Sequence, residues 1–228
     1  PADEPTRRQI LSAQALSVLD GIALSLAANS FLAATTAAVL WLDGPDVGIF
    51  LWLTTVFAIN LARYIGVRIV RRLNCAVERP KRALGVLSLS SFGGGLAWCL
   101  PPFLGSAHGA NGLNPYLIFI IGGICAGSLM QSTAYARTAL LFAGPPLAAA
   151  FVSLLFSGTT EALVIAADAL LLAVMMLRAS QLSEASFIRS QIDRLKAVAL
   201  ATSLSDANAE IRQSYHQLAS LANRDPLT

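Results

Sequence analysis

Long apolar runs, separated by short polar turns, make up most of the chain. A helix needs about 20 predominantly apolar residues to cross the hydrocarbon core of a bilayer. Six stretches qualify, at residues 19–42, 47–70, 83–104, 113–135, 138–156 and 161–177. Turn residues at 43–46, 105–115 and Gly158 separate several of them. The pattern predicts an all-α, polytopic membrane protein with six transmembrane helices.

The last apolar stretch continues into a polar helix. Neither Gly nor Pro occurs between Thr159 and Asp225, and beyond about Leu182 the apolar residues recur in steps of four and three. This is the a/d pattern of a coiled coil. The predicted seam contains Ile188, Ile192, Leu195, Leu204, Ile211 and Leu218, and its phase changes near Val198. Weak seam residues such as Ala207 favour a seam that changes register; a static dimerisation stalk is the alternative.

Composition and charge support the membrane interpretation. Hydrophobic residues make up 55% of the chain and charged residues only 13%, whereas soluble domains carry roughly 25% charged residues. Every Lys and Arg falls at the N-terminus, near the second–third connection, at the fourth–fifth turn, or after the sixth stretch. Because basic residues stay on the cytoplasmic side, we expect both termini to be cytoplasmic.

Several polar residues fall within the predicted spans. Asp168 lies near the middle of the sixth span, where a carboxylate is costly and often functional. It either changes protonation in a sensing or coupling role, or forms a structural hydrogen bond with a polar neighbour such as Asn29, Asn60 or Gln131. These four residues and Tyr135, near the inner boundary, are the candidate ligand or sensing residues.

Two charged residues, Asp20 and Arg63, lie one or two turns inside the cytoplasmic ends of the first and second spans. An ion pair between them would lower the cost of burying each charge. Alternatively, each side chain extends to the membrane interface on its own.

The two histidines, His108 and His216, fall on opposite sides of the predicted membrane. They cannot ligate one haem together within a protomer. His108 alone could serve as an axial haem ligand, or pair with its copy in a dimer, since histidine commonly holds haem iron; a solvated loop histidine is the alternative. Metalloprotease, hydrolase and P-loop motifs are absent from the sequence, so we predict no catalytic residues in this segment.

The C-terminal residues carry a resemblance. Asp225-Pro226-Leu227-Thr228 directly follows the heptad pattern. It resembles the entry of a GGDEF domain, the diguanylate cyclase module, which commonly begins with Asp-x-Leu-Thr-Gly-Leu after such a helix. Asp225, Leu227 and Thr228 match. In overall plan, the six spans resemble the membrane-integral (MASE-like) sensor modules that precede such cyclases in bacteria.

The resemblance implies four parts: a cytoplasmic segment at 1–18, a six-helix transmembrane sensor domain at 19–178, a coiled-coil signalling helix at 179–224, and the start of a GGDEF domain at 225–228. It implies a homodimer in the bacterial inner membrane, in contact with lipid and not with nucleic acid. The dimer would control cyclic di-GMP synthesis by GGDEF domains in cis. The segment itself would not be an enzyme.

Three alternatives remain at this point. A haem-binding redox or gas sensor would use His108. A small transporter would usually show internal repeats and polar sites on broken helices, and no convincing repeat occurs. A histidine-kinase sensor would be followed by a phospho-accepting histidine motif, which the C-terminal residues do not resemble.

Overall fold

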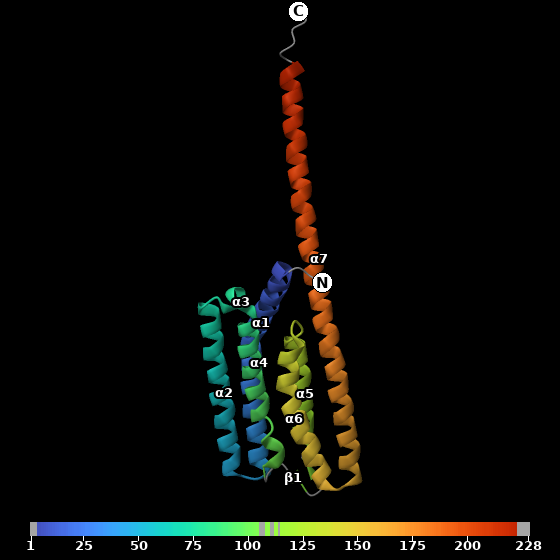
Figure 1. The fold of residues 1–228 in the computed structure, drawn as a ribbon. Helices are drawn as coiled ribbons and strands as arrows, with labels where there is room; N and C mark the ends of the chain where they lie inside the picture. Colours follow the sequence, from blue (N-terminus) through green and yellow to red (C-terminus); the bar gives the residue numbers. More distant parts are fainter. Residues whose placement is uncertain (1–3, 105–107, 110–111, 114, 223–228) are drawn as a thin grey trace, which may run out of the picture. The chain divides into compact units, whose positions relative to one another are not determined.

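The computed structural model describes residues 4–104, 108–109, 112–113 and 115–222. They form α1 (Glu4–Asp43), α2 (Val47–Arg72), α3 (Cys75–Glu78), α4 (Pro80–Ala97), the 3-10 turn η1 (Pro101–Phe103), β1 (His108–Gly109), β2 (Gly112–Leu113), α5 (Pro115–Gln131), α6 (Ala136–Ser157) and α7 (Thr160–Ala222). The two short strands pair antiparallel. The described chain is otherwise helical, which confirms the predicted all-helical class (Figure 1).

Among the described residues, five helices are long and apolar enough to cross a membrane: α1, α2, α4 together with η1, α6 and α7. The sixth predicted span corresponds to α5, which has 17 residues. At 1.5 Å per residue, α5 is about 25 Å long, slightly short of the roughly 30 Å hydrocarbon core. Six crossings therefore remain a prediction.

The chain divides into two compact units, Pro1–Phe187 and Ile188–Thr228. In the first unit, α4 packs against α1, α2 and α6, and α5 packs against α1 and α6. One apolar cluster, containing Trp52 and Trp98, fills the end of the bundle near the α1–α2 turn. A second, containing Leu19 and Leu84, fills the end near α3. These two clusters leave room for polar residues between them.

Two of the predicted turns have a clear local cause. Asp46 is the N-cap of α2, and its carboxylate accepts a hydrogen bond from the Gly48 amide at 2.8 Å, which satisfies a backbone donor that the helix leaves free. Gly158 ends α6 with a φ of 67°, a left-handed conformation that glycine adopts without steric cost.

The prolines differ in their effect. Pro101 and Pro102 lie beyond the end of α4, in η1. In contrast, α6 continues through Pro145 and Pro146. Proline removes the bond to the carbonyl four residues earlier, which frees the carbonyls of Leu141 and Phe142.

Gly95 of α4 lies directly against those two carbonyls. A Cβ atom at Gly95 would overlap the Phe142 carbonyl oxygen and lie 3.0 Å from that of Leu141. Such close contact permits Cα–H···O interactions between helices, so the proline pair and the glycine together explain the tight α4–α6 packing.

The second unit, taken by itself, is helical up to Ala222. Three predicted seam residues are each more than half exposed: Leu204, Ile211 and Leu218. Leu200, four residues before Leu204, is also more than half exposed. An apolar stripe of this kind is typical of a helix that pairs with another helix. Residues 223–228, which carry the resemblance to a GGDEF domain, lie outside the described residues.

Candidate functional site: a polar layer inside the helix bundle

The centre of the layer is a hydrogen-bonded pair of buried asparagines. Asn29 of α1 donates from Nδ2 to Oδ1 of Asn60 on α2 at 3.0 Å, and Asn60 donates from Nδ2 to Oγ of Ser30 at 2.9 Å. Both asparagines are almost fully buried. Both were candidate sensing residues in the sequence, and the structure brings them together.

Two tryptophans extend the layer toward α4. Trp98 donates from its indole nitrogen to Oδ1 of Asn29 at 2.7 Å, and Trp52 donates to the carbonyl of Ala97 at 2.8 Å. The two indole rings meet edge to face, with their centroids 5.2 Å apart. Both polar tips are satisfied while the rings fill the core, which is the usual arrangement for buried tryptophan. Sequence analysis had not connected Trp98 to Asn29, because nothing in the spacing places them side by side.

Arg63 of α2 is the least expected member of the layer. It is only 6% exposed, and Nη2 donates a long hydrogen bond of 3.5 Å to Ser91 Oγ. Its guanidinium lies over the Phe142 ring, 5.7 Å from the centroid. Nε and Nη1 have no hydrogen-bond partner within the described residues. A buried cation without a carboxylate partner is costly, so this side chain has a stronger claim to function than to stability.

Gly94 makes room for this guanidinium. A Cβ atom there would lie 2.8 Å from Nη1 of Arg63 and 3.0 Å from Cε2 of Phe142. Arg63 therefore fits between the bare backbone of α4 and the aromatic ring of α6. Three helices meet at one buried charge.

A small cavity adjoins the layer. It has a volume of about 60 Å³ and is lined by Asn29 and Phe142 from the layer, with Gly123, Gly127 and Ser128 of α5 opposite. Liquid water occupies about 30 Å³ per molecule, so the cavity has room for about two waters or a group of similar size. A Cβ atom at Gly123 or at Gly127 would meet nothing within 4 Å. The space beside α5 is therefore open where these two glycines carry no side chain.

Asp20 does not contact Arg63, so the ion pair that was one of the two alternatives for these residues does not form. Its carboxylate instead pairs with Nη2 of Arg71 at 3.2 Å, and the same Arg71 nitrogen donates to the carbonyl of Leu19 at 2.9 Å. Both charged side chains are more than half exposed. The reason is position along α2: Arg71 lies two turns closer than Arg63 to the end where α1 carries Asp20.

Asp168 does not hydrogen-bond to Asn29 or Asn60. It is exposed on α7 and makes no hydrogen bond or ion pair within the part of the chain that the structure describes. The buried positions of α7 include Ala162, Ala166 and Met176. Because successive helix residues are about 100° apart, Asp168 points away from the side on which Ala166 is buried.

The remaining candidates lie elsewhere or outside the description. Tyr135 is the N-cap of α6, and its carbonyl accepts a 2.7 Å hydrogen bond from Thr138 Oγ1. The side chains of Gln131 and His108 lie outside the described residues; the backbone of His108 pairs with Leu113. Within the described part of the chain, no group of three or more His, Cys, Asp or Glu side chains could hold a metal ion.

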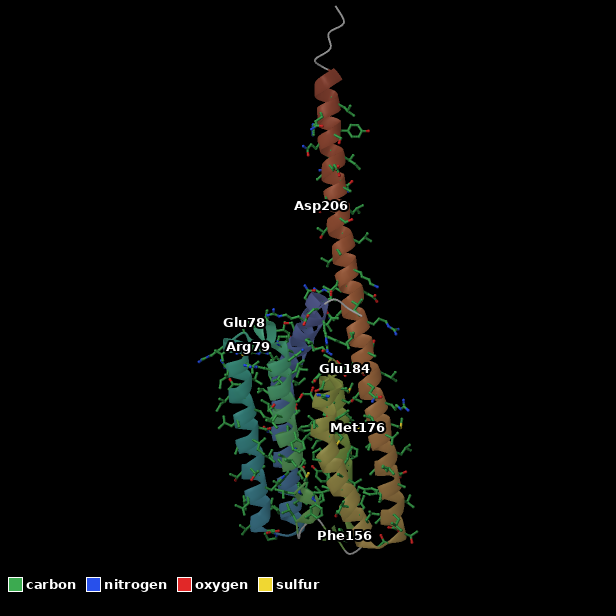
Figure 2. All side chains as sticks on the ribbon, in the orientation of Figure 1. Glu78, Arg79, Phe156, Met176, Glu184 and Asp206 are labelled. Atoms are coloured by element: carbon green, nitrogen blue, oxygen red, sulfur yellow. The ribbon has the colours of Figure 1, made fainter. Side chains whose placement is uncertain are left out.

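A second polar contact, which sequence analysis missed, connects α7 to the rest of the first unit. Glu184 of α7 accepts hydrogen bonds from the Ala136 amide at the start of α6 and from Gln14 of α1, both at 3.2 Å. Gln14 also donates to the carbonyl of Ala134 at 2.8 Å. Figure 2 shows Glu184 on α7, near the end of the bundle that carries the α5–α6 turn. A carboxylate at a helix N-terminus is favourable.

Comparison with protein-family models, with curated proteins and with solved structures finds no match to this chain. The class of protein therefore follows from the fold and the site alone. The chain forms an α-helical bundle whose helices are long and apolar enough for a membrane, with a buried polar layer between two apolar clusters.

Proposed function

We propose that this chain is a membrane-integral sensory and signal-transmitting domain, which controls a C-terminal diguanylate cyclase through a dimeric coiled coil in the bacterial inner membrane. The observation that carries the proposal is α7. This single helix, Thr160–Ala222, contributes an apolar segment to the bundle and an exposed heptad stripe to the second unit. A transporter or channel has no use for the second segment.

Glu184 is the contact through which the bundle would act on α7. It hydrogen-bonds to two other helices at once. A rearrangement of α1 or of the α5–α6 turn would therefore change the constraints on α7. The element that switches would be the set of Glu184 hydrogen bonds, which are either formed or broken. A stimulus shifts this equilibrium only if it binds the two states with different affinity.

The polar layer is the proposed sensing site. The cavity offers a small polar ligand the Asn29 amide and the Ser128 hydroxyl. Arg63 does not line the cavity, and its guanidinium, with two nitrogens unpartnered among the described residues, is a separate buried cation within the same layer. Intramembrane charged residues commonly mark such sites. The stimulus would enter within the bilayer or at its outer rim, because the α1–α2 and α6–α7 connections contain only two or three residues each.

The experiment joins the chain at Thr228 to a GGDEF domain and measures cyclic di-GMP production in membranes. Glu184→Ala removes both hydrogen bonds to α7, and we expect the basal output to change at least threefold. Glu161→Ala, at the exposed start of the same helix, is the matched control and should leave output unchanged. Equal output from all three proteins would overturn the proposed coupling.

A further inference from the structure

A strongly basic pocket lies at the end of the bundle where α1 begins. It has a volume of about 220 Å³ and combines residues from the first turns of α1 with the segment that starts α4. The basic residues that line it are Arg7, Arg8, Arg79, Lys81 and Arg82. Figure 2 places Arg79, beside Glu78, at this end of the bundle.

Within the described residues, hydrogen bonds from side chains of α1 to backbone carbonyls of α3 join the two sides of the pocket, and ion pairs do not. Arg8 donates from Nη2 to the carbonyl of Glu78 at 2.9 Å, and Ser12 donates to the carbonyl of Ala76 at 2.6 Å. Glu4 is the one acidic side chain among the lining residues. Among the described residues, none of the five basic side chains forms a salt bridge. Five cations and one carboxylate leave an excess of positive charge.

The start of α4 adds to this positive potential. The helix begins at Pro80, which also lines the pocket. The N-terminus of a helix carries a partial positive charge and favours anions. The pocket therefore combines concave shape, side-chain charge and helix dipole in favour of one kind of ligand, which is a phosphate group.

The surface next to the pocket favours a lipid as the source of that phosphate. Val86 and Leu89 follow Arg82 by four and seven residues, so they lie on the same face of α4. They are 49% and 70% exposed. Apolar residues that extend from a cationic pocket along a helix of membrane-spanning length match a phospholipid, whose headgroup would enter the pocket while its acyl chains lie along α4.

We propose that this pocket binds the headgroup of an anionic phospholipid, with Arg7, Lys81 and Arg82 contacting the phosphate. Basic pockets between transmembrane helices on the cytoplasmic side recognise such headgroups. The proposal rests on the membrane insertion proposed above but not on control of a cyclase. A bound lipid would connect the start of α1 to the start of α4 more firmly than the two hydrogen bonds do alone.

The test uses the full 228-residue chain purified in detergent. Native mass spectrometry measures binding of dioctanoyl phosphatidylglycerol, with dioctanoyl phosphatidylcholine and inorganic pyrophosphate as separate arms. We compare the native chain with the double variant Arg7→Gln/Arg82→Gln. The matched control, Arg137→Gln/Arg178→Gln, removes the same charge from exposed basic residues outside the pocket.

We expect phosphatidylglycerol to bind the native chain and the control pair alike, more tightly than phosphatidylcholine, and to bind the pocket variant roughly thirty-fold more weakly. Equal binding to all three proteins overturns the proposal. Pyrophosphate binding without selective phosphatidylglycerol binding also overturns it, in favour of a soluble phosphate compound. If the double variant does not fold, Lys81→Gln alone should weaken phosphatidylglycerol binding about fivefold, and unchanged binding would count against the pocket.

Discussion

At the scale of single residues, the buried guanidinium of Arg63 lowers the stability of the fold, and we propose that it is retained for signalling. Two of its nitrogens are buried without a hydrogen-bond partner in the part of the chain that the structure describes, and an unsatisfied buried donor costs about 1–3 kcal/mol. We predict that Arg63→Met raises the free energy of unfolding by about 1 kcal/mol or more while reducing the response of a joined cyclase. Thermal unfolding in detergent and cyclic di-GMP measurements check the two parts.

The control for this substitution is Arg68→Met in the same helix. Arg68 is exposed, and its guanidinium donates to the Tyr64 hydroxyl at 2.6 Å. Arg68→Met should change the free energy of unfolding by no more than about 0.5 kcal/mol. It should also leave the output of the joined cyclase unchanged. A lower stability for Arg63→Met, together with an unaltered response, would show that Arg63 is a structural anchor.

Asp168 poses the opposite problem, because its side chain is exposed within an apolar helix. A carboxylate at this depth is favourable only when it is protonated or covered by protein. We predict that Asp168→Asn changes the output of a joined cyclase at least twofold, since it fixes the side chain in a neutral form. The activity of Glu161→Gln, on the same helix near its exposed end, serves as the reference. Unchanged activity under all stimuli would assign Asp168 a structural role.

At the scale of helices, the α4–α6 packing depends on one missing side chain. A Cβ atom at Gly95 would overlap the Phe142 carbonyl oxygen, whereas one at Gly93 would meet nothing within 4 Å. We predict that Gly95→Ala lowers the free energy of unfolding by about 2 kcal/mol or more, because neither backbone can yield easily. Gly93→Ala should be neutral or stabilising by up to about 1 kcal/mol from helix propensity.

Chemical denaturation in detergent micelles measures both changes. Equal effects from the two substitutions would contradict the close approach at Gly95. The comparison is sharp because the two glycines lie in the same helix, two residues apart, and differ only in what they face.

The exposed heptad stripe of the second unit gives a prediction about association. We expect Leu204→Cys and Ile211→Cys to form disulfide dimers in membranes, because both side chains lie on the apolar seam and are more than half exposed. Ala209→Cys, on the opposite face of the helix, should cross-link much less. The substitutions require a background in which Cys75, Cys99 and Cys125 are replaced by Ser. Monomers at both seam positions would contradict a parallel dimer.

The sequence predicted the helices and turns better than the side-chain contacts between helices. Hydrophobic length and turn residues are local, so the helices and the turns at Asp46 and Gly158 follow from neighbouring residues. The Asn29–Asn60 bond joins two residues that the sequence suggested only as possible partners of Asp168. Pairings such as Asp20 with Arg71 depend on how helices rotate and slide against each other. The Glu184 contacts join residues far apart in the chain, which no local pattern indicates.

At the scale of the whole molecule, the number of crossings decides which side of the membrane the heptad segment occupies. Six crossings place Val77, between α2 and α4, and Ser205, in α7, on the same side. If α5 did not cross, the two would lie on opposite sides. The 17-residue length of α5 is short for a crossing. Its close packing against α6 favours one, as in the 3.6 Å contact from Cys125 Sγ to the Ala143 carbonyl.

Labelling of single cysteines resolves the two cases. In the cysteine-free background, we predict that a membrane-impermeant maleimide reacts with Val77→Cys and Ser205→Cys only in inside-out vesicles. Pro45→Cys, in the exposed α1–α2 turn, should react only in right-side-out vesicles. We expect the cytoplasm on the Val77 side, because Arg71, Arg72, Arg79, Lys81 and Arg82 flank Val77 in the sequence and basic residues favour the cytoplasmic side. Labelling of Ser205→Cys from the same side as Pro45→Cys would mean five crossings, and would place the heptad segment where no cytoplasmic cyclase could receive its signal.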